Sequence, residues 1–272
     1  MLAGLLQLLL PAACAICRAP HEPGSDGIVC GSCLSRIVPL ALPLCARCGH
    51  PRYSLAVPLA QEAPSGSAPS GIAPSGMSGP KRAAPCAWCP HLHPAIRAVR
   101  SVTRMDDGSG PALVHALKYQ GWRGVAVAMG RRMARLSWPD DVLSERAALV
   151  PIPLSRTRLR ERGYNQAQCL ADAIAPMWHC PVWSDVLVRM RDTQSQVRLT
   201  PSERAVNVSR AFAVPQGRLA QLRGAHLVLV DDVVTTAATL NAAAEALVAG
   251  GARIVSAVTF GRAPDPGDRT AS

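Results

Sequence analysis

The chain has 272 residues, 49% of them apolar and 4% aromatic, so it can bury a core made mostly of Leu, Val and Ala. Its formal net charge is +11, carried almost entirely by arginine, and this balance favours an anionic partner such as a nucleic acid or a phosphorylated metabolite. The sequence has no apolar run of the roughly 18 residues that span a membrane, no G-x-x-x-x-G-K-[ST] phosphate loop, and no G-x-G-x-x-G dinucleotide motif after a strand.

The chain begins with MLAGLLQLLLPAACAIC, a short apolar run followed at once by a cysteine pair. A signal peptide normally carries Lys or Arg before its apolar run, and this segment has neither. We therefore expect a buried or amphipathic first helix and a cytoplasmic protein.

Eight of the ten cysteines form four Cys-x-x-Cys pairs within the first ninety residues. The pairs are Cys14/Cys17, Cys30/Cys33, Cys45/Cys48 and Cys86/Cys89. Four thiolates complete a tetrahedral zinc site, so the sequence predicts two closed, structural sites. The short interval between the first two pairs favours them as one site and the last two as the other, with a crossed pairing as the alternative. Disulfides would need an oxidising compartment, and redox pairs usually occur singly. The two remaining cysteines, Cys169 and Cys180, are expected to be ordinary buried thiols.

Residues 61–80 repeat the triplet Ala-Pro-Ser, followed by Gly, three times. A segment so rich in Pro, Gly and Ser cannot bury a core, so we expect a flexible loop that bulges from the second zinc site. The composition changes near residue 95. We therefore divide the chain into an N-terminal helix and zinc-binding region, residues 1–94, and a second domain, residues 95–272.

The second domain alternates helical and extended patterns. Helices are expected over residues 114–119, 124–136, 165–176 and 240–248, and strands over residues 147–153, 227–230 and 254–260. This alternation predicts an α/β fold with a mainly parallel sheet. Ligands of such folds bind at the carboxyl ends of the strands.

The segment 227–240, LVLVDDVVTTAATL, places Asp231 and Asp232 at the end of an apolar strand and hydroxyl side chains before a helix. Backbone N–H groups at a helix N-terminus favour a phosphate, and Thr235, Thr236 and Thr239 add donors. Two adjacent carboxylates can accept hydrogen bonds from neighbouring sugar hydroxyls, or lie near Mg²⁺. A phosphate site next to a diol site describes ribose 5-phosphate.

The same segment resembles the phosphoribosyl pyrophosphate (PRPP) motif of type I phosphoribosyltransferases. The wider chain resembles the ComF/GntX family of phosphoribosyltransferase-like proteins, which is linked to DNA uptake and competence in bacteria. The other matching segments are LLQLLLPAACAIC, the four cysteine pairs, ALKYQG, VPIPLSRTRLRERGYNQAQCLA, RMRDTQSQVRLTPSERAVNVSRAF and AGGARIVSAVTFGR. The resemblance implies a type I phosphoribosyltransferase-like parallel sheet with flanking helices, preceded by a double zinc ribbon.

The resemblance also implies three ligand-binding segments. The PRPP-binding segment would consist of Asp231, Asp232, Val233, Val234, Thr235, Thr236, Ala237, Ala238 and Thr239. A pyrophosphate or anion loop would contain Ser155, Arg156, Arg158, Arg162, Asn165 and Gln166, with a solvated charge run as the alternative. A mobile hood that closes over the substrate would contain Thr193, Gln196, Arg204 and Asn207, with an ordinary surface loop as the alternative. The family usually has Gly where Ala237 stands, so its methyl group is expected to weaken phosphate binding.

Two functions compete. The first is an enzyme of the phosphoribosyltransferase (glycosyltransferase) type, in which Mg²⁺ bridges the pyrophosphate of PRPP. The second is a non-catalytic module whose zinc knuckles and arginines face single-stranded DNA or the DNA-uptake machinery. The few aromatic residues argue against strong base stacking, although Trp88, Trp122 and Tyr164 lie near basic residues. Lys118 is expected to be solvated, with a phosphate contact as the alternative.

Overall fold

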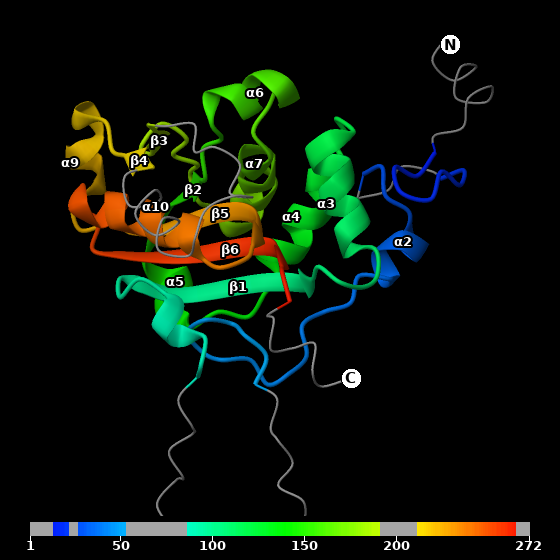
Figure 1. Ribbon diagram of the computed structural model, residues 1–272, viewed down its shortest axis with the longest axis horizontal. Coiled ribbons are helices and arrows are strands. Elements are labelled where there is room, and N and C mark those ends of the chain that lie inside the picture. The colour runs from blue at the N-terminus through cyan, green and yellow to red at the C-terminus, as the bar shows by residue number, and fades with distance from the viewer. Residues whose placement is uncertain (1–12, 22–26, 53–85, 191–210, 265–272) are drawn as a thin grey trace, which may run out of the picture.

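The computed structural model describes residues 13–21, 27–52, 86–190 and 211–264. Its centre is a four-stranded sheet in the order β1-β6-β5-β2, in which all three strand pairings are parallel (Figure 1). The strands are β1 (Ile96–Arg104), β2 (Arg146–Pro151), β5 (His226–Val234) and β6 (Ile254–Arg262). The predicted α/β class is confirmed, and so are the three predicted strands. The edge strand β1 was not predicted.

Helices cover both faces of this sheet. They are α3 (Gly110–Tyr119), α4 (Val125–Ala134) and α7 (Gln166–Trp178) on one face and α10 (Ala238–Ala249) on the other. Along β5, Val228 and Val230 lie in the same buried cluster as α3, α4 and α7, whereas Leu227 and Leu229 face α10. Because both faces are covered, residues 227–230 of this strand are all apolar and do not alternate with polar residues.

The four predicted helices are confirmed with small changes in their ends. Helix α3 begins at Gly110, four residues earlier than expected, with a proline in its first turn where a missing N–H costs nothing. Helix α7 continues to Trp178, and His179 caps it in the left-handed region at φ 46°. Helix α10 begins at Ala238, two residues earlier than expected, so its first turn includes the last two residues of the predicted PRPP-binding segment.

Shorter elements connect this frame. They are α2 (Gly31–Ser35), η1 (Cys89–His91), α5 (Asp140–Glu145), α6 (Arg156–Arg162), β3 (Val188–Arg189), β4 (Phe212–Ala213), η3 (Gln216–Arg218) and α9 (Leu219–Leu222). Strands β3 and β4 pair as a short antiparallel ribbon on either side of residues 191–210. The predicted hood residues Thr193, Gln196, Arg204 and Asn207 lie between them, outside the described residues.

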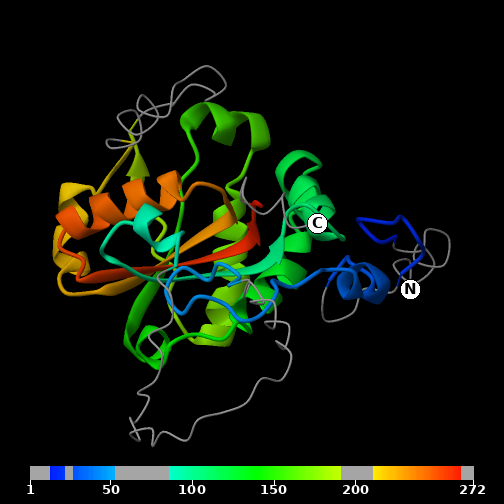
Figure 2. The same ribbon diagram turned by 60° about the horizontal axis from the view of Figure 1, so that its bottom comes forward.

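The two cysteine groups pack on opposite faces of the sheet. Cys14 and Cys33 belong to the buried cluster of α3 and α4, and Cys45 and Cys48 belong to the cluster of α10. Figure 2 shows residues 13–21 on the side of α3 and the chain from α2 onward passing beneath the sheet. Within the described part of the chain, no helix is both long and apolar enough to cross a bilayer.

Candidate functional site

A cleft of about 710 Å³ opens at the carboxyl ends of β2 and β5. Its charged and polar lining comes from α3, α6, the turn between α6 and α7, α7, β3, β5 and α10. These residues are Lys118, Tyr119, Arg158, Glu161, Arg162, Tyr164, Asn165, Gln166, Arg189, Asp231, Asp232 and Thr239. The acidic pair, two of the predicted loop arginines and one predicted threonine therefore meet in one cleft, at the sheet edge where α/β folds bind ligands.

The acidic pair lies within β5, before the strand ends at Val234. Asp232 is buried, and its Oδ1 lies 2.7 Å from Lys118 Nζ. The backbone N–H of Asp232 donates to Asp231 Oδ1 at 2.8 Å. Burial and the adjacent Asp232 charge raise the pKa of Asp231 to about 7. Near neutral pH, Asp231 therefore keeps its proton in part of the molecules, while Asp232 carries the negative charge. A bound ligand that brings hydroxyl donors or a cation would favour ionisation of both carboxyl groups.

The turn after β5 leads directly into α10. Ala237 is the N-cap of the helix at φ 60°, ψ 3°, and its side chain offers no cap to the first-turn N–H groups. This left-handed conformation is easy for Gly and costs Ala about 1 kcal/mol. The methyl group is buried with the α10 core cluster. The turn therefore has the backbone shape that Gly would allow, with uncapped N–H groups that suit an anion.

The threonines of this segment differ in position. Thr235 and Thr236 are exposed, whereas Thr239 lines the cleft in the first turn of α10. Val233 also lines the cleft, and Val234 and Ala237 are buried beneath it. The predicted PRPP-binding segment thus combines cleft-facing, exposed and supporting residues.

Helix α6 forms the opposite wall of the cleft. Ser155 caps it by accepting the backbone N–H of Arg158 at 3.3 Å. Arg158 and Arg162 line the cleft, while Arg156 is exposed on the same short helix and does not. One guanidinium group can donate two parallel hydrogen bonds to the oxygens of a phosphate. This wall is therefore suited to a second anionic group of the ligand.

Asn165 and Gln166 begin α7 behind this wall. The Asn165 side chain donates to the Ile152 carbonyl at 2.9 Å and accepts from the Ala167 N–H at 3.1 Å, so it fixes α7 to the end of β2. Gln166 is 1% exposed, and among the described residues its Nε2 has no hydrogen-bond partner. An unpaired buried donor costs about 1–3 kcal/mol, so Gln166 is a candidate to donate to a bound ligand.

Five polar or charged cleft residues were not among the predicted site residues: Lys118, Tyr119, Glu161, Tyr164 and Arg189. Lys118 and Tyr119 lie at the end of α3. Lys118 was expected to be solvated, but its ammonium group pairs with Asp232. Tyr119 is 67% exposed, and the Arg162 guanidinium lies 5.2 Å from its ring centre. The Tyr164 hydroxyl donates to the Leu117 carbonyl and holds this end of α3 at the cleft. The available sequence signal was the rarity of lysine, since Lys118 is one of two.

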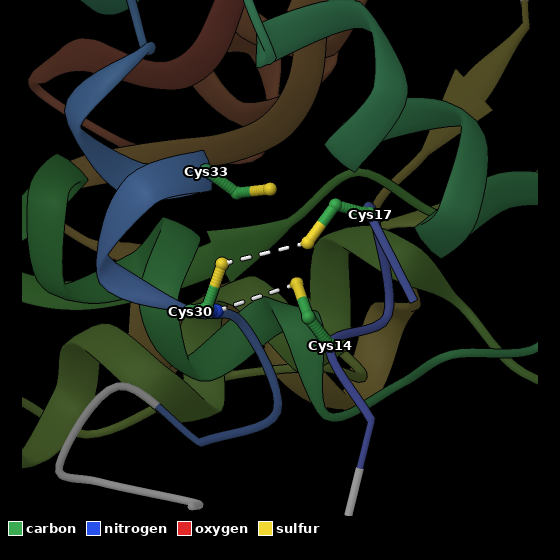
Figure 3. A group of neighbouring side chains, drawn as sticks. All are labelled: Cys14, Cys17, Cys30 and Cys33. Carbon is green, nitrogen blue, oxygen red and sulfur yellow. Dashed lines mark hydrogen bonds between the residues drawn. The ribbon is translucent and has the colours of Figure 1, made fainter. Parts of the chain in front are cut away.

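The first cysteine group brings its four sulfur atoms within 4.8 Å of one another. Figure 3 shows the side chains of Cys14, Cys17, Cys30 and Cys33 converging on one point. The sulfur atoms of Cys17 and Cys30 are 3.7 Å apart, near the spacing of about 3.8 Å expected for tetrahedral zinc. Cys14 Sγ accepts backbone N–H groups from Ile16 and Cys30, each at 3.4 Å. Burial raises the pKa of Cys14, but these backbone N–H groups outweigh it and lower the value to about 6.

The second group unites Cys45, Cys48, Cys86 and Cys89, also within 4.8 Å. Its sulfur contacts are 3.5 Å for Cys45–Cys89 and 3.4 Å for Cys48–Cys86. The cysteines therefore associate in the uncrossed pairing that the spacing favoured. Arg262 is buried beside this group and donates from Nη2 to the Cys48 carbonyl at 2.5 Å. Its buried cation offsets the charge of a tetrathiolate, and both groups fit structural zinc in donor type and spacing.

Comparisons with known proteins agree with this arrangement. A family model described as a double zinc ribbon domain matches residues 5–67, and one described as a phosphoribosyl transferase domain matches residues 167–270. The DNA utilization protein YhgH of Salmonella typhimurium (strain LT2) is 30% identical over 260 residues, 91% of this chain and 96% of that protein. Competence protein ComFC of Bacillus subtilis (strain 168) is 37% identical over 113 residues, 41% of this chain and 43% of that protein. Competence protein F of Haemophilus influenzae is 31% identical over 117 residues, 43% and 48% of the two chains.

The parallel sheet, the cleft and the two cysteine groups define a protein that joins a double zinc ribbon to a phosphoribosyltransferase domain. Its two cysteine groups are structural zinc sites. The chain belongs to the ComF/GntX family of phosphoribosyltransferase-like proteins, as its sequence motifs predicted.

Proposed function

We propose that this protein binds PRPP, or a ribose 5-phosphate, in the cleft at the end of β5 and acts in DNA uptake or DNA utilisation. The names of its relatives, DNA utilization protein and competence protein, support the cellular role. The observation that carries the ligand is the meeting of adjacent carboxylates, an uncapped helix start and a pair of arginines in one cleft. Eight thiols that ligate zinc fit a reducing compartment, so the cytoplasm is the proposed location.

Each part of PRPP has a matching surface in this cleft. The turn over residues 235–239 would receive the 5-phosphate at the start of α10. Asp231 and Asp232 would accept hydrogen bonds from the two ribose hydroxyls. Arg158 and Arg162 would face the pyrophosphate, and Gln166 offers a buried donor nearby. Mg²⁺ bound with the pyrophosphate would neutralise further charge on it.

This arrangement favours transfer chemistry of the glycosyltransferase type. The bond from the anomeric carbon to pyrophosphate breaks, a bond to the acceptor forms, and the acceptor loses a proton. The residues of the cleft supply charge stabilisation: the carboxylates lie beside a cationic sugar, and Arg158 and Arg162 hold the departing pyrophosphate. The lining is therefore suited to stabilising separated charges during displacement.

Calorimetry of the purified protein with PRPP and Mg²⁺ tests this proposal. We expect saturable heat with the native protein and none with the double variant Asp231→Asn/Asp232→Asn. Arg158→Ala should weaken binding by about tenfold, as expected for the loss of a charged hydrogen bond of about 1.5 kcal/mol. Arg156→Ala is the matched control, since this arginine shares α6 but does not line the cleft. Absence of heat with the native protein, or unchanged heat with the double variant, would refute the proposal.

A second candidate is the binding of single-stranded DNA on the surface beside the cleft. Three arginines lie over aromatic rings there, in the pairs Arg18/Trp122, Arg123/Tyr164 and Arg162/Tyr119. Alternating cations and rings are the usual means of holding phosphates and stacked bases. Fluorescence anisotropy with labelled oligothymidylate should show an affinity that falls steeply with salt, and Tyr119→Ala should cost about 1–3 kcal/mol. Affinity that is independent of salt would refute this role.

A further inference from the structure

The side chain of Asn241 bonds α10 to the segment that leaves the second zinc site. Its Nδ2 donates to the His91 carbonyl at 2.7 Å, and its Oδ1 accepts the His93 N–H at 2.8 Å. His91 and His93 lie two and four residues after the zinc ligand Cys89. The backbone N–H of Asn241 donates to the Ala237 carbonyl at 2.8 Å, the first helical bond after the phosphate turn. One residue therefore joins the zinc segment to the start of α10.

The other end of the phosphate turn is joined to the same zinc site. Val234, the last residue of β5, pairs with Arg262 across the sheet, and the Ala263 N–H donates to the Val234 carbonyl at 2.9 Å. Arg262 in turn donates to the carbonyl of the zinc ligand Cys48, and its guanidinium lies 4.4 Å from the Trp88 ring centre. Both strand and helix that hold the turn are thus anchored on the second site.

The first zinc site has a different partner. It packs with α3, where Ser109 Oγ donates to the carbonyl of the zinc ligand Cys33 at 2.6 Å. Ala237 and Val234 share their buried cluster with Cys45 and Cys48, on the opposite face of the sheet. The two sites therefore differ in what they can position, although their four-sulfur chemistry is the same.

We propose that the second zinc site positions the phosphate turn through Asn241, so that zinc at this site and a phosphate ester in the cleft strengthen each other's binding. This inference rests on the proposed ribose 5-phosphate site. Such coupling is reciprocal, because each ligand must change the other's affinity by the same factor. Asn241 is a positioning residue: it acts on the turn through the first helical bonds of α10.

Zinc release to a chromogenic chelator, with ribose 5-phosphate as the probe, measures this coupling in the full-length protein. We expect saturating ribose 5-phosphate to slow the release of one of the two ions by about 5- to 20-fold. Asn241→Ala should still bind both ions but lose this protection, and its affinity for ribose 5-phosphate should fall by a similar factor. Asn241→Asp, which keeps the acceptor for the His93 N–H and loses the donor, should lie between the two.

Ser109→Ala is the matched control, because it removes the equivalent side-chain bond to the first zinc site. It should leave both the protection and the affinity unchanged. Equal protection in Asn241→Ala and native protein, or loss of protection in Ser109→Ala, would overturn the inference while leaving the ligand site intact. Absence of calorimetric heat with both ribose 5-phosphate and PRPP would instead overturn the ligand site, and the inference with it.

Discussion

Replacing Asp231 with asparagine should stabilise the ligand-free protein at alkaline pH. Burial and the adjacent Asp232 raise the pKa of Asp231 from 3.8 to about 7. Between these values the folded protein keeps a proton that the unfolded chain has released. The free energy of unfolding therefore falls as pH rises through this window, and the full loss is present above the folded-state pKa. Asparagine removes the charge and keeps an oxygen to accept the Asp232 N–H.

The magnitude follows from the size of the pKa change. At about 1.4 kcal/mol for each pKa unit, a rise from 3.8 to about 7 would be worth about 4 kcal/mol. Asp231 is partly exposed, so solvent screening reduces this to about 1–2 kcal/mol. We expect Asp231→Asn to raise the free energy of unfolding by this amount at pH 8.5 and by about half as much at pH 5.5, which lies midway between the two pKa values.

Urea unfolding followed by circular dichroism, with zinc present, measures the difference between native and variant protein at the two pH values. Asp232→Asn is the matched control, because it leaves the Lys118 ammonium group without its carboxylate and should destabilise by about 1–2 kcal/mol. The two adjacent Asp→Asn substitutions would then change the free energy of unfolding in opposite directions. A destabilising Asp231→Asn, or a stabilising effect that does not grow between pH 5.5 and pH 8.5, would contradict this account of the acidic pair.

Three further predictions concern other parts of the molecule. Lys118→Met should cost about 1–2 kcal/mol, and adding Asp232→Asn should recover most of it, which a double-mutant cycle by urea unfolding measures. Ala237→Gly relieves a left-handed backbone worth about 1 kcal/mol but removes a buried methyl group worth about 0.8 kcal/mol, so stability should change by less than about 1 kcal/mol. Because that methyl is buried in the core, calorimetric affinity for ribose 5-phosphate should change less than about threefold, and a tenfold rise would show that the methyl obstructs the phosphate. Metal analysis should find about two zinc ions per chain in Cys180→Ser and about one in Cys48→Ser.

The features that the sequence predicted well are those determined by residues within one short segment of the chain. The run that became β5 is apolar on both faces and ends in two acids, so its burial and its polar end could both be inferred locally. Each cysteine pair likewise forms one turn, and the short link from Cys17 to Cys30 favoured the uncrossed grouping that the sulfur positions show.

The features that were missed depend on partners far away in the chain. Lys118 pairs with Asp232 across 114 residues of sequence, so its spacing gave no hint of burial. Strand β1 was also missed; it reads IRAVRSVTR, so three of its nine residues are arginine. Arg100 is 8% exposed because its guanidinium donates to the carbonyls of Ala46, Val99 and Ser137, two of them from other segments. Buried arginine is stable only with such partners, and no local pattern reveals them.

The partners of β1 also give the second zinc segment a structural role. This strand is at the edge of the sheet, and an uncovered edge invites pairing with another chain. The Val99 N–H donates to the Arg47 carbonyl at 2.8 Å, and Pro39 forms a bridge with Thr103. The Arg47 guanidinium also donates hydrogen bonds to the carbonyls of Ile96 and His93, each at 3.1 Å. A segment organised by metal therefore covers the edge that the sheet itself leaves open.

Removal of zinc from the second site should expose this edge and cause association between chains. We expect light scattering to rise after chelation of the native protein and to stay low when zinc is supplied again before association begins. Cys17→Ser, which disrupts only the site packed on α3, should lose about one zinc ion per chain and remain dispersed. If the chelated protein stayed monomeric, or if Cys17→Ser associated as readily as the chelated protein, the protection of β1 would not depend on the second zinc site.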